Sequence, residues 1–376
     1  MPKINNYRAD VIGSMLRTDY LLRAREQHAT GKLSQLEFKR VEDRAVNDCV
    51  AIQEQAGVDV VTDGEMRRNV FASQLAEACE GFKSIPNNTV DWFTLDGKVE
   101  HSPVTVGLVS KLRRKRHLSS EEFVYLRASA TALKKITIPS PTMYAYYWVP
   151  GVSSAAYPTT DAYMADVTDI LKDEVAELAR LGADYIQIDA PEFGMLIDPH
   201  QQEWFARKGF KPHNMLHDGI AMIDAIIAGH PGITFGLHVC RGNDASRYMA
   251  RGGYEVVADT VFRTGAQRLL LEYDDQPSGD FGPLRKVPDD KIVVLGLLTT
   301  KFAREEQPED LRKRIEEASG YVPLERLALS TQCGFASVAR GNNIPFELQE
   351  RKLRLVAEVA HEVWGAPPRL GQITSA

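Results

Sequence analysis

The sequence predicts an α/β fold, a (β/α)₈ TIM barrel with long βα-loop insertions, and two observations support this prediction. Short apolar runs recur along the chain, and helical patterns lie between most of them. Most runs are continuous rather than alternating, as expected for parallel strands covered on both faces. An open doubly wound sheet is the alternative, but it usually has fewer strands, and its glycine-rich phosphate turn is missing. The expected strands are residues 9–14, 58–62, 135–140, 185–189, 233–238, 269–273, 292–297 and 327–331.

Several helices between these strands carry recognisable boundary signals. Ser34 and Glu37 form a capping box ahead of a helix that reaches about Ala56. Two further helices are expected to end before a glycine, and the last helix ends at one. Thr160 is expected to cap the helix that ends before Gly182, and Pro308 to begin the helix that ends before Gly320. The last helix begins at about Phe346 and ends at Gly365.

We expect residues 1–376 to form a single barrel domain, because no long Pro/Gly/Ser linker divides the chain. Two segments exceed ordinary loop lengths. One is an insertion of about residues 82–134 between the second and third strands, and the other is a long loop of about 190–217 after the fourth strand. A long βα excursion lies at the catalytic end of a barrel, so both are candidate lids or site walls.

Composition excludes several classes of protein. Hydrophobic residues make up 44% and charged residues 26%, which is ordinary globular usage and excludes disordered and coiled-coil classes. The net charge of −6 gives no basic surplus for nucleic-acid binding. The basic run 111–117 is interpreted as a solvated face or an anion contact at a subunit boundary. No run is long and apolar enough for a membrane helix, and residues 1–8 lack the apolar centre of a secretion signal, so we expect a cytoplasmic protein.

Potential metal ligands follow three of the predicted strands. His238 and Cys240 end the fifth strand on one side of it, Glu272 ends the sixth, and Cys333 follows the eighth. For His238 and Cys240 alone, a packed histidine and a buried cysteine is an open alternative. Together, two thiolates, an imidazole and a carboxylate suit zinc. The other cysteines, Cys49 and Cys79, have apolar neighbours at helical spacing and are interpreted as core-facing helix residues.

Other strand ends are also polar. Ser14 ends the first strand, Glu65 follows the second and Asp189 ends the fourth. The two carboxylates could bind the ammonium group of an amino acid, and the structural alternative is helix capping or pairing with Arg67 or Arg68. The aromatic run 142–148 after the third strand could stack on a planar ligand, although packing is the more common role of such a run.

In this order, the strand ends resemble the catalytic C-terminal barrel of cobalamin-independent methionine synthase, in a single-barrel form. The resemblance covers nearly the whole chain. Its motifs are Ile12-Gly13-Ser14, Gly64-Glu65-Met66-Arg67-Arg68-Asn69, Gln187-Ile188-Asp189, His238-Val239-Cys240, Glu272 and Cys333-Gly334.

The resemblance implies a zinc-dependent methyltransferase that makes methionine from homocysteine. His238, Cys240 and Cys333 would be permanent zinc ligands, and Glu272 the ligand that the substrate thiol displaces. Zinc binding deprotonates a thiol, and the resulting zinc thiolate then attacks the methyl carbon in line. Ser14 would lie near the homocysteine carboxylate, with Glu65 and Asp189 on its ammonium group.

The methyl-donor half of the family pattern is altered. The family barrel has a histidine, thought to donate a proton, after its seventh strand. Here that segment reads Gly296-Leu297-Leu298-Thr299-Thr300-Lys301. Tyr147 and Trp148 are the candidates for donor binding, and the donor is left open between methyl-folate and another molecule.

Three other functions are kept as alternatives. The first is a zinc-dependent thiol alkyltransferase of the epoxyalkane–coenzyme M transferase type. The second is a metal-free enzyme resembling uroporphyrinogen decarboxylases, whose carboxylate pocket would use arginines such as Arg67, Arg68 and Arg241. The third is a non-catalytic zinc protein. The expected partners are a small-molecule thiol and a methyl donor, and both a homo-oligomer and a methyl-delivering partner protein are left open.

Overall fold

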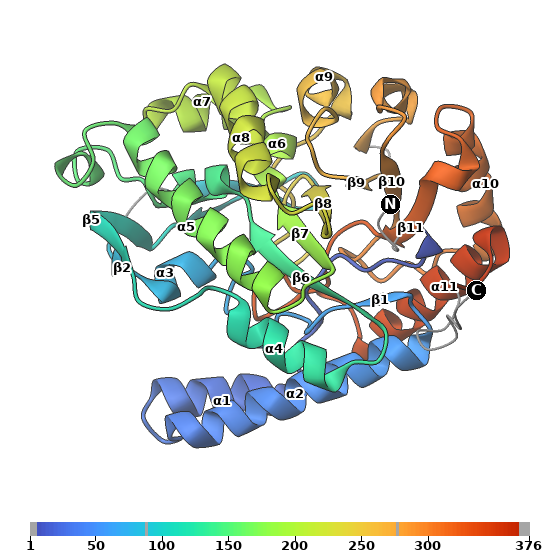
Figure 1. Cartoon of the computed structure of the whole chain (residues 1–376), viewed down its shortest axis with the longest axis horizontal. Helices are drawn as coiled ribbons and strands as arrows, with labels where there is room; N and C mark the ends of the chain where they lie inside the picture. The colour runs from blue at the N-terminus through green and yellow to red at the C-terminus, as the bar shows by residue number, and fades with distance from the viewer. Residues whose placement is uncertain (1–5, 87–88, 276–277, 368–376) are drawn as a thin grey trace.

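A curled, parallel sheet of seven strands forms the centre of the protein (Figure 1). The computed structural model describes residues 6–86, 89–275 and 278–367. Neighbouring strands in space follow the order of the chain, so each connection carries the chain to the next strand. The strands are β1 (Val60–Val61), β6 (Leu133–Pro139), β7 (Tyr185–Asp189), β8 (Thr234–Val239), β9 (Arg268–Glu272), β10 (Ile292–Leu298) and β11 (Leu327–Thr331).

Seven of the eight predicted strands are present, and the first is not. Of residues 9–14, only Ala9 forms a bridge, parallel to Leu329 of β11. The Asp59 carboxylate accepts hydrogen bonds from the backbone N–H groups of Arg8 and Ala9, at 2.6 and 2.8 Å. These bonds occupy donors that a strand ladder would need, so the segment crosses the sheet edge without becoming a strand.

The N-terminal segment nevertheless contacts both edges of the sheet. The Asp10 N–H donates to the Leu329 carbonyl, and the Asp59 N–H, just before β1, donates to the Ala9 carbonyl, both at 2.9 Å. Inside the sheet, the Asp10 carboxylate binds Lys135 Nζ at 2.7 Å and Arg268 Nη2 at 3.3 Å. This buried ion cluster ties the segment to β6 and β9 and fixes the start of the loop that carries Ser14.

The remaining strand predictions are confirmed with small shifts. Residues 185–189 and 327–331 match β7 and β11 in full, whereas the second predicted strand shortens to Val60–Val61. The register pairs Pro139 of β6 with Asp189 of β7, and Asp189 with His238 of β8. The carboxyl ends of three neighbouring strands therefore lie level, which brings their polar residues to one edge.

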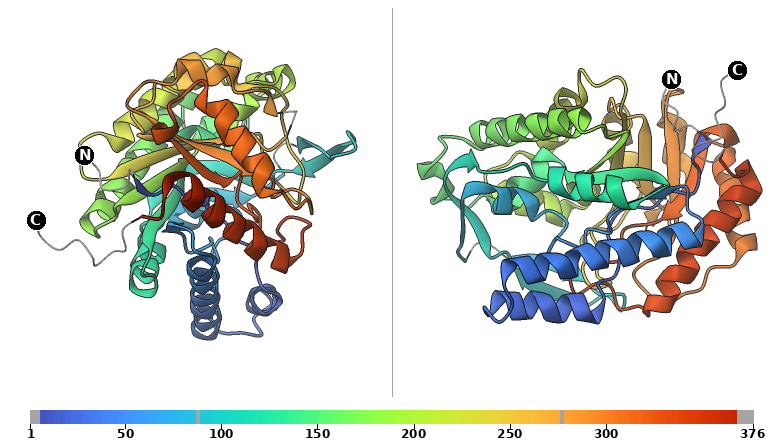
Figure 2. Two further views of the ribbon diagram at one scale, coloured as in Figure 1. Left: turned by 90° about the vertical axis from the view of Figure 1, so that its right-hand side faces the viewer. Right: turned by 60° about the horizontal axis from the view of Figure 1, so that its bottom comes forward.

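Helices pack side by side around the outside of the sheet, in the order α8, α5, α4, α2, α11 and α10 (Figures 1 and 2). The Ser34–Glu37 capping box is confirmed, but Thr159, not Thr160, caps α5, because its hydroxyl accepts the Ala162 N–H. The bounds are α2 (Gln35–Ala56), α4 (Ser120–Ser129), α5 (Thr160–Arg180), α8 (Pro212–Ile227), α10 (Pro308–Ser319) and α11 (Phe346–Trp364).

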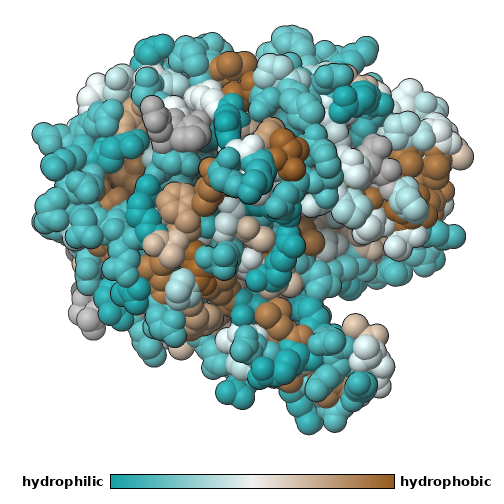
Figure 3. All heavy atoms as spheres, turned by 180° about the vertical axis from the view of Figure 1, so that it is seen from behind, coloured by the Kyte–Doolittle hydropathy of each residue, from teal (hydrophilic) through white to brown (hydrophobic). Residues whose placement is uncertain are grey.

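The first helix, α1 (Asp19–Ala29), lies against α2 (Figure 2). Seen from behind, this pair projects from a mainly hydrophilic surface (Figure 3). Among the described residues, no helix combines the length and the apolar character that a membrane span needs.

The insertion between β1 and β6 contains two small antiparallel sheets, β2–β5 and β3–β4. The spacing of Ser119 and Glu122 predicts a capping box at the start of α4, and this prediction is wrong: Glu122 pairs with Arg68, and the Ser119 hydroxyl accepts from Gln74 Nε2 at 2.6 Å. Cys79 is buried as predicted, but it begins a strand instead of lying in a helix. The elements are α3 (Gln74–Ala78), β2 (Cys79–Ser84), β3 (Thr89–Phe93), β4 (Val99–Pro103) and β5 (Val106–Arg114).

The predicted long loop after β7 is mostly helical. It contains α6 (Pro191–Met195), α7 (Pro199–Arg207) and the first turns of α8, and each of these helices has proline at its first position. A further short helix, α9 (Ala258–Val261), follows β8. The single-domain organisation stays a prediction, and residues 1–5 of the segment that carried the secretion argument lie outside the described residues.

Candidate metal centre

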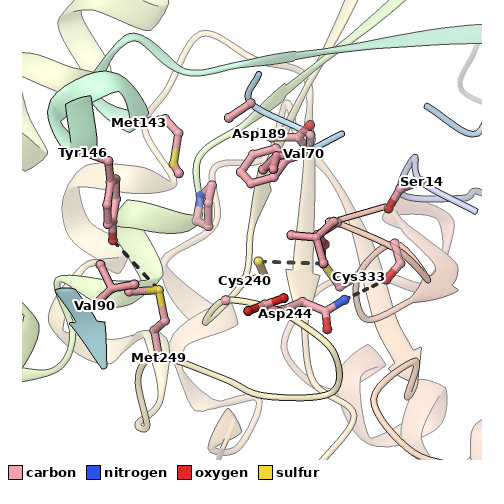
Figure 4. Close-up of a pocket in the computed structure, with 18 of the residues that line it drawn as sticks. Ser14, Val70, Val90, Met143, Tyr146, Asp189, Cys240, Asp244, Met249 and Cys333 are labelled. Carbon is pink, nitrogen blue, oxygen red and sulfur yellow. Dashed lines mark hydrogen bonds between the residues drawn. The ribbon is translucent and has the colours of Figure 1, made fainter. Parts of the chain in front are cut away.

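Three of the four predicted zinc ligands meet at the carboxyl ends of the strands. His238 lies in β8, Cys240 directly follows β8, and Cys333 follows β11. All three side chains are buried, and one ligand atom from each lies within 4.8 Å of the others. The two sulfur atoms are 3.9 Å apart (Figure 4). Residues 93 positions apart in the sequence thus form one cluster because parallel strands end at one edge.

The donor atoms of this cluster fit zinc. His238 Nδ1 lies 3.2 Å from the Leu270 carbonyl, which can only accept, so Nδ1 carries the proton and Nε2 has a free lone pair. Nε2 is buried and has no hydrogen-bond partner. The sulfur separation is close to the ~3.8 Å expected for two sulfurs each about 2.3 Å from one tetrahedral zinc.

The electrostatics of the two thiols differ. The hydrogen bond with Cys240, reinforced by His238, holds the pKa of Cys333 well below its usual range. The same hydrogen bond, together with burial, raises the pKa of Cys240. One thiolate therefore forms readily without a metal, which gives an incoming cation an anionic sulfur ligand.

Glu272, the predicted fourth ligand, lies outside this cluster of described residues. Its Oε1 pairs with Lys301 Nζ at 2.5 Å, and its Oε2 accepts the backbone N–H of Arg241 at 2.7 Å. The sequence correctly brings Glu272 to the end of β9, but strand position alone does not determine which cation its carboxylate contacts. Its role as a metal ligand stays a prediction.

A cavity of about 300 Å³ opens over the metal cluster, and Ser14, Glu65 and Asp189 all line it. Glu65 follows Gly64 with a positive φ of 55°, a conformation that costs energy for a residue with a side chain. Its Oε1 accepts the Thr137 hydroxyl at 2.8 Å and lies 3.4 Å from Arg68 Nη1, and its Oε2 is buried with no hydrogen-bond partner. The structural alternative of pairing with Arg68 is thus partly realised, and one oxygen is left for a ligand.

The other two predicted substrate residues have few competing contacts. Asp189 Oδ1 accepts from Gln187 Nε2 at 2.6 Å. Burial raises the pKa of Asp189 to about 7, and the neighbouring Glu65 carboxyl adds to the increase. Ser14 Oγ accepts only a long bond of 3.3 Å from the Ala336 N–H. A Cβ at Gly334 would lie 3.0 Å from the Ser14 backbone nitrogen, so glycine is required for this close approach of the two loops.

The aromatic pair predicted for donor binding separates in the structure. Tyr147 lines the cavity. Trp148 does not: it packs against Tyr163 of α5, with ring centroids 5.9 Å apart, and lines a different cavity. The two residues end a 3₁₀ helix, Pro141–Tyr147, and the backbone turns between them, so adjacent side chains point to different cavities.

The far wall of the cavity consists of residues that sequence reasoning missed. Tyr146 from the same aromatic run donates to Met195 Sδ at 2.8 Å, and Met249, Val90 and Met143 lie beside it (Figure 4). Tyr146 and Met143 could have been found from that run, whereas Val90 lies in β3 and Met249 in a loop, without any strand-end pattern. Further apolar lining comes from Val70, Phe71, Trp92, Pro103, Val104 and Val106.

Comparison with known proteins decides the family. The family profile described as "Cobalamin-independent synthase, Catalytic domain" matches residues 8–361. The chain belongs to the cobalamin-independent methionine synthase family.

Relatives within and near this family span almost the full chain. The uncharacterized protein YxjH of Bacillus subtilis is 34% identical over 95% of both chains. Methionine synthase of Pyrococcus furiosus is 25% identical over 88% of this chain and 86% of its own. A putative vitamin-B12-independent methionine synthase from Listeria monocytogenes has a TM-score of 0.73 at 27% identity, covering 96% of this chain and 98% of the other.

Lys301 ends the segment 296–301, in which no histidine was found. Its side chain is 2% exposed and pairs with Glu272. Lys301 is absent from the cavity lining among the described residues.

Proposed function

We propose that this protein is a zinc-dependent methyltransferase that moves a methyl group to the thiol of homocysteine to give methionine. The proposal rests on one observation: a single cavity is lined both by potential metal ligands and by carboxyl groups. A His/Cys/Cys cluster lies at its base, and two buried carboxyl groups, Glu65 and Asp189, lie beside it. Membership of the cobalamin-independent methionine synthase family supports the same reaction.

His238, Cys240 and Cys333 would hold zinc, which when bound lowers the pKa of a substrate thiol and keeps its sulfur nucleophilic. His238 is held in place by its bond to the Leu270 carbonyl, so its Nε2 stays directed at the cluster. In the transfer, the sulfur–carbon bond forms as the bond from the donor to the methyl carbon breaks, and the electron pair stays on the donor.

The amino-acid part of homocysteine would bind at the strand-end side of the cavity. The free oxygen of Glu65 and the carboxyl group of Asp189 suit an ammonium group, and the Ser14 hydroxyl suits the carboxylate. Glu65 follows β1, Asp189 ends β7, and Ser14 lies in the N-terminal segment that is bonded to both sheet edges, so they would orient the substrate with little motion of their own. The walls of the cavity would also exclude water from the reacting sulfur.

The methyl donor is the open half of this proposal. Methyl-folate is the family expectation, but the wall facing the cluster is apolar, and the segment 296–301 lacks the histidine that the family has after its seventh strand. These two observations favour a thiol alkyltransferase with another donor, of the epoxyalkane–coenzyme M transferase type, as the second candidate. The same two observations concern the methyl donor more than the thiol. Homocysteine stays the favoured thiol, because Glu65 and Asp189 suit an ammonium group and not a sulfonate.

The metal-free, decarboxylase-like alternative has little support. Its expected arginines are engaged elsewhere: Arg67 pairs with Asp43, Arg68 with Glu122, and Arg241 bonds to backbone carbonyls. None of the three is among the described residues that line the cavity.

Titration of the zinc-loaded protein with matched thiols tests the proposal. We expect homocysteine to bind at least tenfold more tightly than 4-mercaptobutanoate, which lacks only the ammonium group, and than coenzyme M. Tighter binding of coenzyme M would move the second candidate to first place. Failure of the protein to bind zinc would contradict both candidates.

We also propose that the sheet closes into a (β/α)₈ barrel, with residues 9–14 between its two edges. The support is the pair of backbone hydrogen bonds that link Ala9 and Asp10 to the two edges of the sheet. Closure would hold Ser14 beside Gly334, as the proposed homocysteine site requires.

A further inference from the structure

The Glu272–Lys301 pair lies directly behind the metal cluster. Both side chains are 2% exposed, and Nζ of Lys301 is 2.5 Å from Oε1 of Glu272. The other oxygen accepts the N–H of Arg241, the residue that follows Cys240. Both carboxylate oxygens are thus engaged by cationic or backbone donors, one residue away from a proposed zinc ligand.

When a metal ion is bound, the metal ion and the Lys301 ammonium group would compete for the Glu272 carboxylate. The family resemblance makes Glu272 the metal ligand that the substrate thiol displaces, whereas in this structure its Oε1 is held by Lys301. A buried carboxylate released from a metal would be costly without a counter-charge, because an unpaired charge in the interior is strongly unfavourable. Lys301 is positioned to receive Glu272 at no such cost.

Lys301 also has a second buried carboxylate nearby. Although burial alone would lower the pKa of Lys301, the carboxylates of Glu272 and Asp274 raise it. Asp274 is itself buried, and it follows β9 two residues after Glu272. The Asp274 carboxyl group is thus a second source of negative charge near Lys301, and burial raises its own pKa to about 7.

We propose that Lys301 is a positioning residue that competes with the metal for the Glu272 carboxylate and so keeps the fourth metal position open to the substrate thiol. This inference rests on the proposed function, since it concerns the same metal centre. It assigns the lysine a role that needs no contact with the methyl donor, in agreement with its absence from the described cavity lining.

The test compares the zinc and homocysteine affinities of the full-length wild type with those of Lys301→Met/Asp274→Asn. This double variant removes one positive and one negative buried charge, so the net charge of the interior is unchanged. With Lys301 gone, Glu272 is free to bind the metal. We expect zinc affinity, measured against a chromophoric chelator, to rise at least tenfold, and homocysteine affinity to fall at least tenfold.

A matched control removes a different buried lysine pair. Lys352 Nζ is 2.5 Å from Glu306 Oε2, and neither residue lines the cavity. Lys352→Met/Glu306→Gln should leave both affinities within about threefold of the wild type. Opposite shifts in two affinities are not expected from a general loss of structure, which would weaken both.

A second variant tests the inference without altering Lys301. Glu272→Gln keeps the size of the side chain and one oxygen that can accept from Lys301 or from the Arg241 N–H, so it perturbs the fold less than the double variant does. If Lys301 holds Glu272 off the metal, zinc affinity should change less than threefold. A tenfold or greater loss of zinc affinity would overturn the inference.

Outcomes for the inference and for the proposed function are distinguishable. Unchanged affinities in the folded double variant overturn the inference alone, provided that the wild type binds zinc and then homocysteine. A wild type that binds no zinc, or zinc but no homocysteine, overturns the proposed function and the inference together. Cobalt-loaded protein gives a second readout, because added thiol should intensify the sulfur-to-metal charge-transfer absorption that the two cysteine thiolates already give in the wild type.

Discussion

The two sides of the cavity differ in chemistry and in origin. The strand-end side carries Ser14, Glu65, Asp189 and the His/Cys/Cys cluster, all positioned by the parallel sheet. The opposite wall carries Tyr146, Met143, Val90 and Met249, which come from a 3₁₀ helix, the insertion and a loop (Figure 4). The first side is polar with unsatisfied buried atoms, and the second is apolar.

This difference indicates which side of the cavity determines the binding of each substrate. Groups at strand ends are held by the sheet, so they suit the step that requires fixed geometry, thiol activation. Groups on inserted segments can vary without disturbing the sheet, so they suit the choice of the second substrate. Changes on the two sides should therefore affect different measured quantities.

The largest expected effect comes from the metal cluster. Cys333→Ser should abolish methyl transfer and weaken zinc binding by more than the roughly 100-fold that loss of an outer-shell partner causes. Elemental analysis and a chelator competition assay measure the loss. Cys79→Ala, a buried cysteine outside the cluster, is the matched control and should keep a full complement of zinc. Equal zinc contents in the two variants would contradict the assignment.

The next effect separates the ammonium site from the metal site. Glu65→Gln should weaken homocysteine binding by about 2–3 kcal/mol, or about 100-fold, because a buried charged partner is lost. Zinc content should not change, and the affinity for 4-mercaptobutanoate should stay within about twofold of the wild type. Calorimetric titration with both thiols measures the difference, and an equal loss for both would rule out an ammonium contact at Glu65.

A change on the apolar wall should affect the other substrate. Met249→Ala removes several methylene-sized groups from the cavity, which is worth about 1–3 kcal/mol of ligand contact. We expect the KM for the methyl donor to rise about tenfold, while the homocysteine Kd stays within about twofold. Steady-state kinetics at saturating homocysteine measure this. A change confined to homocysteine binding would break the division between the two sides.

The last prediction concerns the stability of the fold, and not the binding of a substrate, at the anchor of the apolar wall. Glu192 is buried, and its Oε1 accepts hydrogen bonds from the Thr142 hydroxyl, at 2.6 Å, and from the Ser140 hydroxyl. Both residues lie at the start of the 3₁₀ helix that carries Tyr146. Burial raises the pKa of Glu192 to about 7, against the lowering effect of these hydrogen bonds. Between about pH 4.5 and 7 the folded state thus holds a proton that the unfolded state releases, so stability falls as pH rises.

Glu192→Gln should remove this fall, whose full size is up to about 3 kcal/mol. Urea unfolding of the variant and the wild type at several pH values measures it. The two free-energy curves should diverge as pH rises through this range. Parallel curves would mean that Glu192 does not titrate there.

The strand-end side was predictable from the sequence, and the wall was not. Leu269–Leu271 and Ile292–Leu295 are continuous apolar runs, which is a strong local signal, and the topology then brings the strand ends together. The prediction of residues 9–14 as a strand is wrong because the Asp59 side chain, distant in sequence, takes the backbone donors. Local patterns cannot show such a contact.

Side-chain partners were the other limit of sequence reasoning. Glu272 lies at the predicted strand end, but its pairing with Lys301 depends on two neighbouring strands together. Trp148 was predicted beside Tyr147, and a turn of the backbone directs it to another cavity. The apolar wall draws residues from four separate segments, and no single segment carries a pattern that marks it as part of a site.

The central claim is that the His238/Cys240/Cys333 cluster holds a zinc ion at which the homocysteine thiol is activated. X-ray absorption at the zinc edge, on the zinc-loaded wild type with and without homocysteine, tests it most directly. The claim predicts two sulfur ligands without homocysteine and three with it. A sulfur count that stays at two under saturating homocysteine would contradict it.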